Sequence, residues 1–296
     1  MTKFKKDSIG VVLAVVGILM FSAKAVLVKL AYTYEVKSTH ILLLRMLFSL
    51  PFYLVIAIFK KNNLNSIKTS KDYVYLIIMG FTGYYLSSLF DFEGLRYIKA
   101  GLERIILFIY PTLVILISFI FLGKKIPKVK IYSIILTYLG IFMAFWYEPK
   151  FEGQNLTLGT ILIFFSALTY AIYLIGSSQL IPKFGVFIFT SYAMIVSCCC
   201  VFIHYFIVDN GDFLSYEINV YIIAFLMAVF CTIIPSYLVS AAIQRLGAST
   251  FAIFGSLGPF STIFLAFIFL GESLNYLQFI GAIIVIFGVY LVGKKK

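Results

Sequence analysis

The sequence predicts an all-α membrane protein in which ten transmembrane helices form two inverted five-helix repeats. Three observations carry this prediction. The 296 residues are 62% apolar and 12% charged, with a mean hydropathy of +1.04, whereas a soluble domain carries about 25% charged residues. Apolar runs of about 20 residues, the length that spans a bilayer as a helix, recur along the whole chain. Finally, one stretch of the first half occurs again in the second half.

This repeated stretch indicates an internal duplication. Its first copy runs through Pro111 to Phe-Ile-Phe-Leu-Gly at residues 119–123, and its second copy runs through Pro259 to the same five residues at 267–271. A constant spacing over a proline and a run of five identical residues is typical of a repeat architecture.

The same offset of 148 residues, half the chain, also relates Gly140 to Gly288. We therefore predict two domains of equal length, residues 1–148 and 149–296. Each domain is expected to form one five-helix repeat.

The apolar runs are predicted to be helices, because only helices and closed barrels satisfy every backbone polar group in lipid. Barrel strands would alternate polar and apolar residues, and these runs do not alternate. The first run contains Lys24 and has no small-residue cleavage site after it, so we expect a retained helix and not a signal peptide. The predicted spans are residues 9–31, 40–59, 73–91, 100–122, 129–147, 158–180, 186–208, 218–240, 249–270 and 275–293.

The loop charges predict the orientation of these spans. With both termini in the cytoplasm, most loop lysines fall inside, and the outside receives only Lys37, Arg96, Lys99 and Lys150. Five spans per half is an odd number, so the second half must enter the membrane inverted. The first copy of the repeat accordingly continues into basic Lys124 and the second into acidic Glu272. Inverted repeats are a hallmark of secondary transporters.

Two motifs connect the chain to a known family. The first is Gly-Leu-Arg-Tyr-Ile-Lys-Ala at residues 94–100, leading to Tyr110-Pro111. The second is Ala-Ile-Gln-Arg-Leu-Gly-Ala at residues 242–248, leading to Gly258-Pro259 and Leu-Gly-Glu at 270–272. With these motifs the whole chain resembles the drug/metabolite transporter superfamily, in its group of paired EamA-type domains.

The resemblance implies ten helices in two inverted bundles around a central cavity, lined mostly by spans 1, 3, 4, 6, 8 and 9. It also implies transport of amino acids or other small metabolites. The first repeat departs from the family pattern at Lys124, where an acidic residue is usual. A role for the acid is therefore not carried over to that repeat.

Charged residues inside apolar spans are costly and are functional candidates by default. The candidates for binding substrate in the cavity are Lys24, Glu103 and Arg104, and those for coupling or gating are Glu103, Asp91 and Arg45. Helix rise places them together in the outer third of the membrane. The alternative is that they form structural ion pairs, or that their ends reach the headgroups.

Neutral residues complete the predicted site. Tyrosine and serine side chains inside the spans could line the cavity, or could instead lie at interfaces and in aromatic belts: Tyr84, Tyr85, Ser88, Tyr173, Ser177 and Ser256. Pro111 and Pro259 lie mid-span, where each is expected to kink its helix for gating or merely for packing.

Several classes of function are excluded or disfavoured. No phosphate-binding Gly-x-x-x-x-Gly-Lys-Ser/Thr loop occurs in the sequence, which disfavours ATP-driven pumping. Cys198, Cys199 and Cys200 are consecutive and would point in different directions from one helix, so no metal site is expected. The basic residues behind the net charge of +12 lie in short clusters between spans, which argues against nucleic acid as a binding partner. We expect no enzymatic activity and no cofactor. A homodimer remains compatible with close helix contact at Gly281 and Gly288.

The sequence therefore predicts a secondary transporter in the plasma membrane, with a bacterial inner membrane favoured. Its partners would be the lipid bilayer and a small organic metabolite, such as an amino acid or a related zwitterion or anion, moved by alternating access. Proton coupling through Glu103 is left open. The alternative is a non-transporting membrane sensor or assembly subunit with a transporter-like body.

Overall fold

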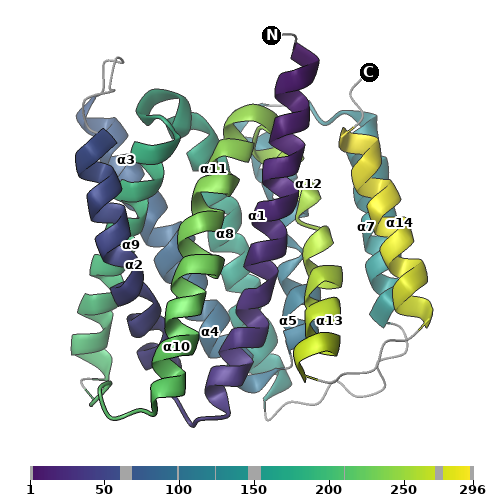
Figure 1. Cartoon of the computed structure of the whole chain (residues 1–296). Helices are drawn as coiled ribbons and strands as arrows, with labels where there is room; N and C mark the ends of the chain where they lie inside the picture. The colour runs from purple at the N-terminus through teal and green to yellow at the C-terminus, as the bar shows by residue number, and fades with distance from the viewer. Residues whose placement is uncertain are drawn as a thin grey trace.

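The computed structural model of the chain is a bundle of helices that stand side by side (Figure 1). It describes residues 3–60, 69–98, 100–123, 125–145, 155–209, 211–270 and 276–293. These residues form helices and connecting turns, and no strand occurs among them. Eight helical stretches of the described residues, some of which join two or three of the helices named below, are long and apolar enough to cross a membrane. The prediction of an all-helical, multi-pass membrane protein is therefore confirmed.

The helices follow the predicted spans to within a few residues at most ends. Those of the first half are α1 (Lys3–Tyr32), α2 (Ser38–Lys60), α3 (Ser70–Gly80), η2 (Phe81–Leu86), α4 (Ser87–Tyr97), α5 (Ala100–Leu107), α6 (Tyr110–Leu122) and α7 (Lys128–Phe145). Those of the second half are α8 (Leu156–Phe184), α9 (Val186–Val208), α10 (Ile218–Ala228), η3 (Val229–Ile233), α11 (Ile234–Leu246), α12 (Ala248–Phe254), α13 (Leu257–Leu270) and α14 (Tyr276–Gly293).

Two of the spans contain π-helical turns. η2 joins α3 to α4 without interruption, and η3 joins α10 to α11 in the same way. A π-turn adds a residue to the helix turn, which rotates the faces before and after it, and such turns are frequent at functional sites. Apolar periodicity in the sequence gave no sign of either turn.

The mid-span prolines break their helices, a stronger effect than the expected kink. α5 ends at Leu107 and α6 begins at Tyr110, so Pro111 lies in the first turn of α6, where its missing N–H costs no helix bond. α12 likewise ends at Phe254, and Pro259 lies in the first turn of α13.

Glycine and capping residues set other ends. Gly247, with φ of +78°, separates α11 from α12, and Gly185, with φ of +77°, separates α8 from α9. Glycine reaches positive φ without the steric cost that other residues have. Thr69 and Asp72 form a capping box at the start of α3. The Asp72 carboxylate also accepts from Lys183 Nζ at 2.6 Å, which ties the start of α3 to the end of α8.

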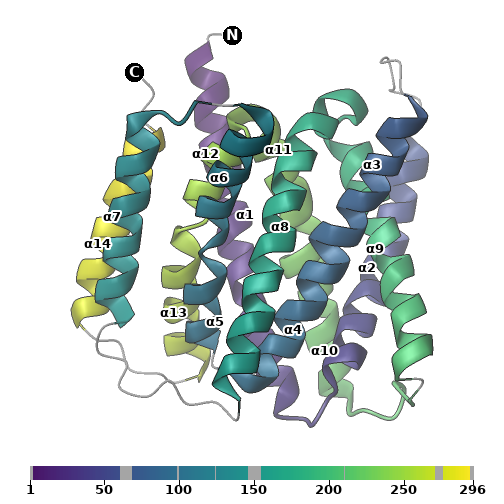
Figure 2. The ribbon, with the colours of Figure 1, turned by 180° about the vertical axis from the view of Figure 1, so that it is seen from behind.

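The helices pack in pairs from both halves of the chain. α1 packs against α11 and α13, α8 packs against α4 and α6, and α2 packs against α9. α7 and α14 pack against each other at one edge of the bundle, as Figure 2 shows from behind. A Cβ atom at Gly140 of α7 would lie 2.6 Å from the Gly281 carbonyl oxygen of α14, and one at Gly288 would lie 3.1 Å from the Ser133 oxygen. The glycines thus allow close contact within the chain.

The outer faces of the helices are apolar. Phe59, Phe121 and Phe269 are each at least 70% exposed, as expected for side chains that face lipid. α1 begins and α14 ends at the same end of the bundle, near the labelled N and C termini in Figure 1.

Candidate functional site

A cavity of about 90 Å³ lies where helices of both halves meet. One ordered water needs about 10–15 Å³ on this measure, so the cavity has room for a small organic group. Its lining comes from α1, α2, η2, α4, α5, α6, α8, η3, α12, α13 and the helix breaks: Ile18, Phe21, Ser22, Lys24, Arg45, Gly83, Tyr84, Ser87, Ser88, Leu107, Phe108, Tyr110, Ser166, Tyr170, Thr232, Phe251, Gly255, Gly258 and Pro259.

Two cationic side chains reach this cavity. Lys24 of α1 forms an ion pair with Asp91 of α4, with Nζ 2.6 Å from Oδ2. The Asp91 side chain is 1% exposed and that of Lys24 is 12% exposed, so the pair is buried within the bundle. A buried pair of this kind costs desolvation energy, which its mutual attraction must offset.

Arg45 of α2 is only 2% exposed. Its guanidinium carbon lies 4.8 Å from the centre of the Phe92 ring, within the range of a cation–π contact. Its buried Nε and Nη2 atoms have no hydrogen-bond partner. Both cations therefore lie at the cavity, but only Lys24 has a carboxylate at ion-pair distance in the described structure.

Aromatic rings form much of the remaining wall. Tyr110 and Tyr170 meet edge to face with centroids 5.3 Å apart, and Tyr170 stacks on Tyr173 at 6.0 Å. Tyr173 lies behind the lining and contacts Tyr84 edge to face at 4.9 Å. The fit is close: a Cβ atom at Gly83 would lie 2.2 Å from the Tyr173 ring, so η2 can approach α8 only with glycine there.

Two of the lining hydroxyl groups are bound to nearby backbone. Ser22 donates to the Ile18 carbonyl at 2.8 Å, and Thr232 donates to the Met227 carbonyl at 3.0 Å. The Thr232 bond reaches back five residues, which η3 makes possible. Because each hydroxyl group has given its proton to a carbonyl, its remaining capacity is that of an acceptor.

The structure brings several predicted residues together at the cavity and leaves others outside its lining. Lys24, Arg45, Tyr84, Ser88 and Pro259 line it, with Asp91 directly behind Lys24. Tyr85 instead contacts His204 Nδ1 at 2.9 Å. Ser177 donates to the Leu174 carbonyl of its own helix at 2.9 Å, and Ser256, in the break between α12 and α13, donates to the Ile253 carbonyl at 2.7 Å. Neither they nor Tyr173 appear in the lining.

Two of the remaining predicted residues, Glu103 and Pro111, lie outside the cavity lining. Glu103 is fully buried but lies outside the cavity lining, one helical turn before Leu107, which does line it. The side chain of Arg104 lies outside the described part of the structure. Pro111 follows Tyr110 at the break between α5 and α6.

Sequence reasoning missed some of the lining. Tyr170 and Ser166 lie on α8, one and two turns before the predicted Tyr173, and the spacing of Tyr173 and Ser177 could have been extended toward them. Thr232 lies in η3, and its direction depends on a π-turn for which we find no sequence signal.

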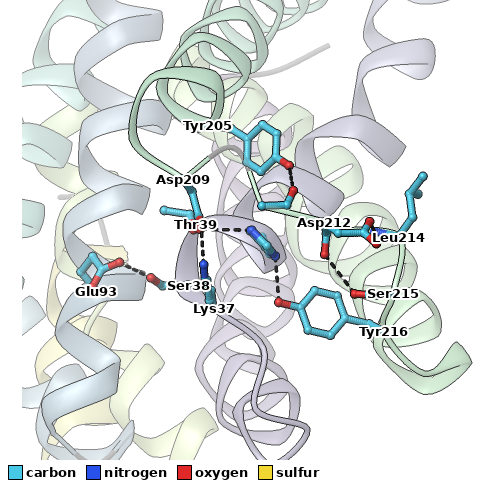
Figure 3. Close-up of polar contacts among 12 residues, drawn as sticks. Lys37, Ser38, Thr39, Glu93, Tyr205, Asp209, Asp212, Leu214, Ser215 and Tyr216 are labelled. Carbon is cyan, nitrogen blue, oxygen red and sulfur yellow. Dashed lines mark hydrogen bonds and ion pairs between the residues drawn. The ribbon is translucent and has the colours of Figure 1, made fainter.

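A second polar cluster, outside the cavity, joins the two halves at the end of the bundle opposite the termini (Figure 3). Asp209, at the end of α9, accepts from Lys37 Nζ at 2.6 Å and from Thr39 Oγ1 at 2.5 Å. His40 lies between Asp209 and Tyr216, with ring nitrogens 3.1 Å from Oδ2 and 2.8 Å from the phenol oxygen. The start of α2 is thereby fixed to the α9–α10 connection.

The contacts between Lys37 and Asp209 shift the pKa values of both groups. The hydrogen bond to Asp209 raises the pKa of Lys37 above its usual value of 10.5. Burial alone would raise the pKa of Asp209, but the hydrogen bonds from Lys37 and Thr39 outweigh it and lower that pKa below 3.8. Both groups are therefore charged at neutral pH.

Comparison with known proteins gives a consistent result. Residues 8–146 and 157–294 each match the EamA-like transporter family. The chain is 27% identical to the uncharacterized transporter YcbK of Bacillus subtilis over 95% of this chain and 91% of that one. It is 24% identical to the uncharacterized transporter YetK of the same organism, over 77% and 70% of the chains. One crystal structure has the same fold, with a TM-score of 0.74 at 11% identity over 96% and 97% of the chains.

Proposed function

The chain belongs to the EamA-like transporter family, and we propose that it is a secondary transporter that carries a small organic metabolite through the central cavity by alternating access. The observation that carries this proposal is the cavity itself. Its lining combines residues of the first matched segment, such as Lys24 and Tyr84, with residues of the second, such as Tyr170 and Thr232. A site between two bodies can open to either side when the bodies move relative to each other.

We further propose ten spans in two inverted repeats, residues 1–148 and 149–296. The sequence offset of 148 residues supports this arrangement, because it also relates structural details. It relates the start of η2 at Phe81 to the start of η3 at Val229.

The contacts between α7 and α14 support the same symmetry. Gly140 packs on Gly281, and Gly288 packs on Ser133. The offset converts the first contact into the second, as a two-fold relation between the halves requires.

For the orientation, we propose that both termini are cytoplasmic and that the protein lies in the plasma membrane. Support comes from lysines at the end of the bundle where α1 begins and α14 ends. Lys60 ends α2, Lys71 lies in the first turn of α3, and Lys183 lies in the last turn of α8. Cytoplasmic ends of transmembrane helices carry an excess of such residues.

Reconstitution tests the proposal. The purified full-length protein in liposomes should move at least one solute from a mixed pool of amino acids and organic acids, followed by mass spectrometry of the vesicle contents. Ser88→Trp, which places a large side chain in the cavity lining, should abolish this flux. Ser215→Trp, on an exposed loop, is the matched control and should transport normally. Equal flux through both variants would contradict a route through the cavity.

A further inference from the structure

The buried guanidinium of Arg45 has hydrogen-bonding capacity that the protein does not use. Arg45 is 2% exposed and lines the cavity. Its Nε and Nη2 atoms are buried without a hydrogen-bond partner. These two atoms carry parallel N–H bonds on one edge of the planar group, the fork to which a carboxylate binds through both oxygens.

The surroundings give the Nε and Nη2 atoms of Arg45 no hydrogen-bond partner. Asp91, the buried carboxylate that neighbours the cavity lining, lies 2.6 Å from Lys24 Nζ. The face of the Phe92 ring offers Arg45 a cation–π contact but accepts no bond from the fork. Among the described lining residues, the charged ones are Lys24 and Arg45, and both are cations.

An arrangement of this kind destabilises the protein on its own. Buried donors without partners and buried charge without compensation both cost free energy. Sites that bind ligands often retain such strain, because the ligand supplies the missing partner. The unused fork of Arg45 therefore points to a ligand with two adjacent anionic oxygens.

The cavity limits what this ligand can be. The side chains of Lys24, Arg45 and Asp91 together carry one excess positive charge, which a monoanion balances. The volume of about 90 Å³ suits a small molecule. Phe21, Phe108 and Tyr170 offer an apolar surface to its body.

We propose that Arg45 is the anion-binding group of the cavity and that its ligand is a small organic monocarboxylate, whose oxygens bind Nε and Nη2 and whose apolar body lies against Phe21, Phe108 and Tyr170. This inference rests on the proposed transport function, because it names the substrate class of the same cavity. It narrows the earlier range of amino acids, zwitterions and anions to monocarboxylates.

Binding to the purified full-length protein tests the proposal. The probes are three carboxylates with their uncharged amides: benzoate and benzamide, phenylacetate and phenylacetamide, butyrate and butyramide. Phenylalanine represents zwitterions and inorganic phosphate represents other anions. Calorimetry and the shift of the unfolding temperature report binding. At least one carboxylate should bind, its amide should not, and phenylalanine and phosphate should bind more weakly.

Arg45→Met should weaken carboxylate binding on the order of 10- to 100-fold, as expected for loss of charge-assisted hydrogen bonds. Without ligand, the same variant should unfold at a higher temperature than the wild type, because two buried nitrogen atoms without hydrogen-bond partners are gone. Arg245→Met, an equal change of charge on α11, should alter neither property. A structural role for Arg45 predicts the opposite, a lower unfolding temperature and unchanged binding.

The proposal is overturned if no carboxylate binds, if amides or phenylalanine bind as well as carboxylates, or if Arg45→Met binds carboxylates like the wild type. Flux in liposomes separates this failure from that of the transport function. Transport of neutral or zwitterionic solutes that Arg45→Met leaves intact would retain the transporter and reject the anion site. Carboxylate binding that needs Arg45, without flux of any bound compound, would retain the anion site and reject transport.

Discussion

Lys24 Nζ lies 2.6 Å from Asp91 Oδ2, and this ion pair joins α1 to α4 beside the cavity. The two partners are not equivalent. Asp91 is the more buried of the two, and Arg45 carries a second positive charge close by, because Phe92, under its guanidinium, is the next residue to Asp91. Removal of Asp91 therefore leaves two buried cations, whereas removal of Lys24 leaves Asp91 with Arg45.

We accordingly predict that Asp91→Asn destabilises the protein more than Lys24→Met. Loss of one partner of a buried ion pair costs about 3–5 kcal/mol, and Asp91→Asn should lie at the upper end of this range. The measurement is the free energy of unfolding in detergent. A double variant that removes both charges should recover part of the loss. If Lys24→Met were the more harmful change, the assignment of Asp91 as the shared counter-ion would be wrong.

The sequence predicts this group of charges because charge is costly in lipid, so Lys24, Arg45 and Asp91 stand out against their apolar spans. Their pairing depends on the rotation of α1, α2 and α4 about their axes. Sequence does not specify these rotations when the helices are apolar on most sides. The preference of Lys24 over Arg45 for Asp91 could therefore be found only in the structure.

The fold likewise has parts that the sequence predicts and parts that only the structure shows. Span 186–208 coincides with α9, because Gly185 before it and the polar Asp209 after it mark both ends. By contrast, Tyr170 and Thr232 escaped prediction. The spacing of Tyr173 and Ser177 on α8 could have been extended to Tyr170, whereas the direction of Thr232 follows from the π-turn of η3.

The contact of α7 with α14 gives a second prediction. A side chain at Gly140 would press against the Gly281 carbonyl oxygen, 2.6 Å from the position of a Cβ atom. Gly140→Val should lower the free energy of unfolding by about 1–3 kcal/mol, the usual cost of overpacking. Gly258→Ala, where the nearest atom is 3.6 Å away, is the control and should be tolerated. If Gly140→Val left the free energy of unfolding unchanged, α7 and α14 could separate without loss of stability.

The polar cluster at Asp209, outside the cavity, gives a prediction for pH. The lowered pKa of Asp209 means that its contribution to stability is present above pH 3.8 and is lost as pH falls through its folded value. The raised pKa of Lys37 means that its contribution is present below pH 10.5 and is lost as pH rises through its folded value. Stability should therefore be greatest between these limits.

Unfolding temperature measured against pH checks this prediction. Asp209→Asn should flatten the acid limb of the profile, since the carboxylate that titrates is gone. Asp212→Asn, which removes an exposed carboxylate of the same connection, is the matched control and should keep the wild-type profile. An unchanged acid limb in Asp209→Asn would assign the acid sensitivity to other groups.

Proton coupling through Glu103 is the last prediction. Its carboxyl group is fully buried and lies one helical turn from Leu107 in the cavity wall. Intramembrane carboxylates serve as proton carriers in many transporters, because protonation removes a charge that is costly in the membrane. In liposomes with an imposed pH gradient, wild-type flux should follow the gradient. Glu103→Gln keeps the shape of the side chain but cannot release a proton. This variant should transport at the same rate with and without the pH gradient.

The control for this experiment is Glu93→Gln, the same chemical change at a partly exposed carboxylate that binds Ser38 and Arg96. It should leave the response to the gradient intact. A response that survives in Glu103→Gln would exclude Glu103 as the coupling group while leaving the route through the cavity in place. Loss of all flux, with the variant still folded, would instead place Glu103 among the groups that every transport cycle needs, because coupling alone accounts only for the dependence on the gradient.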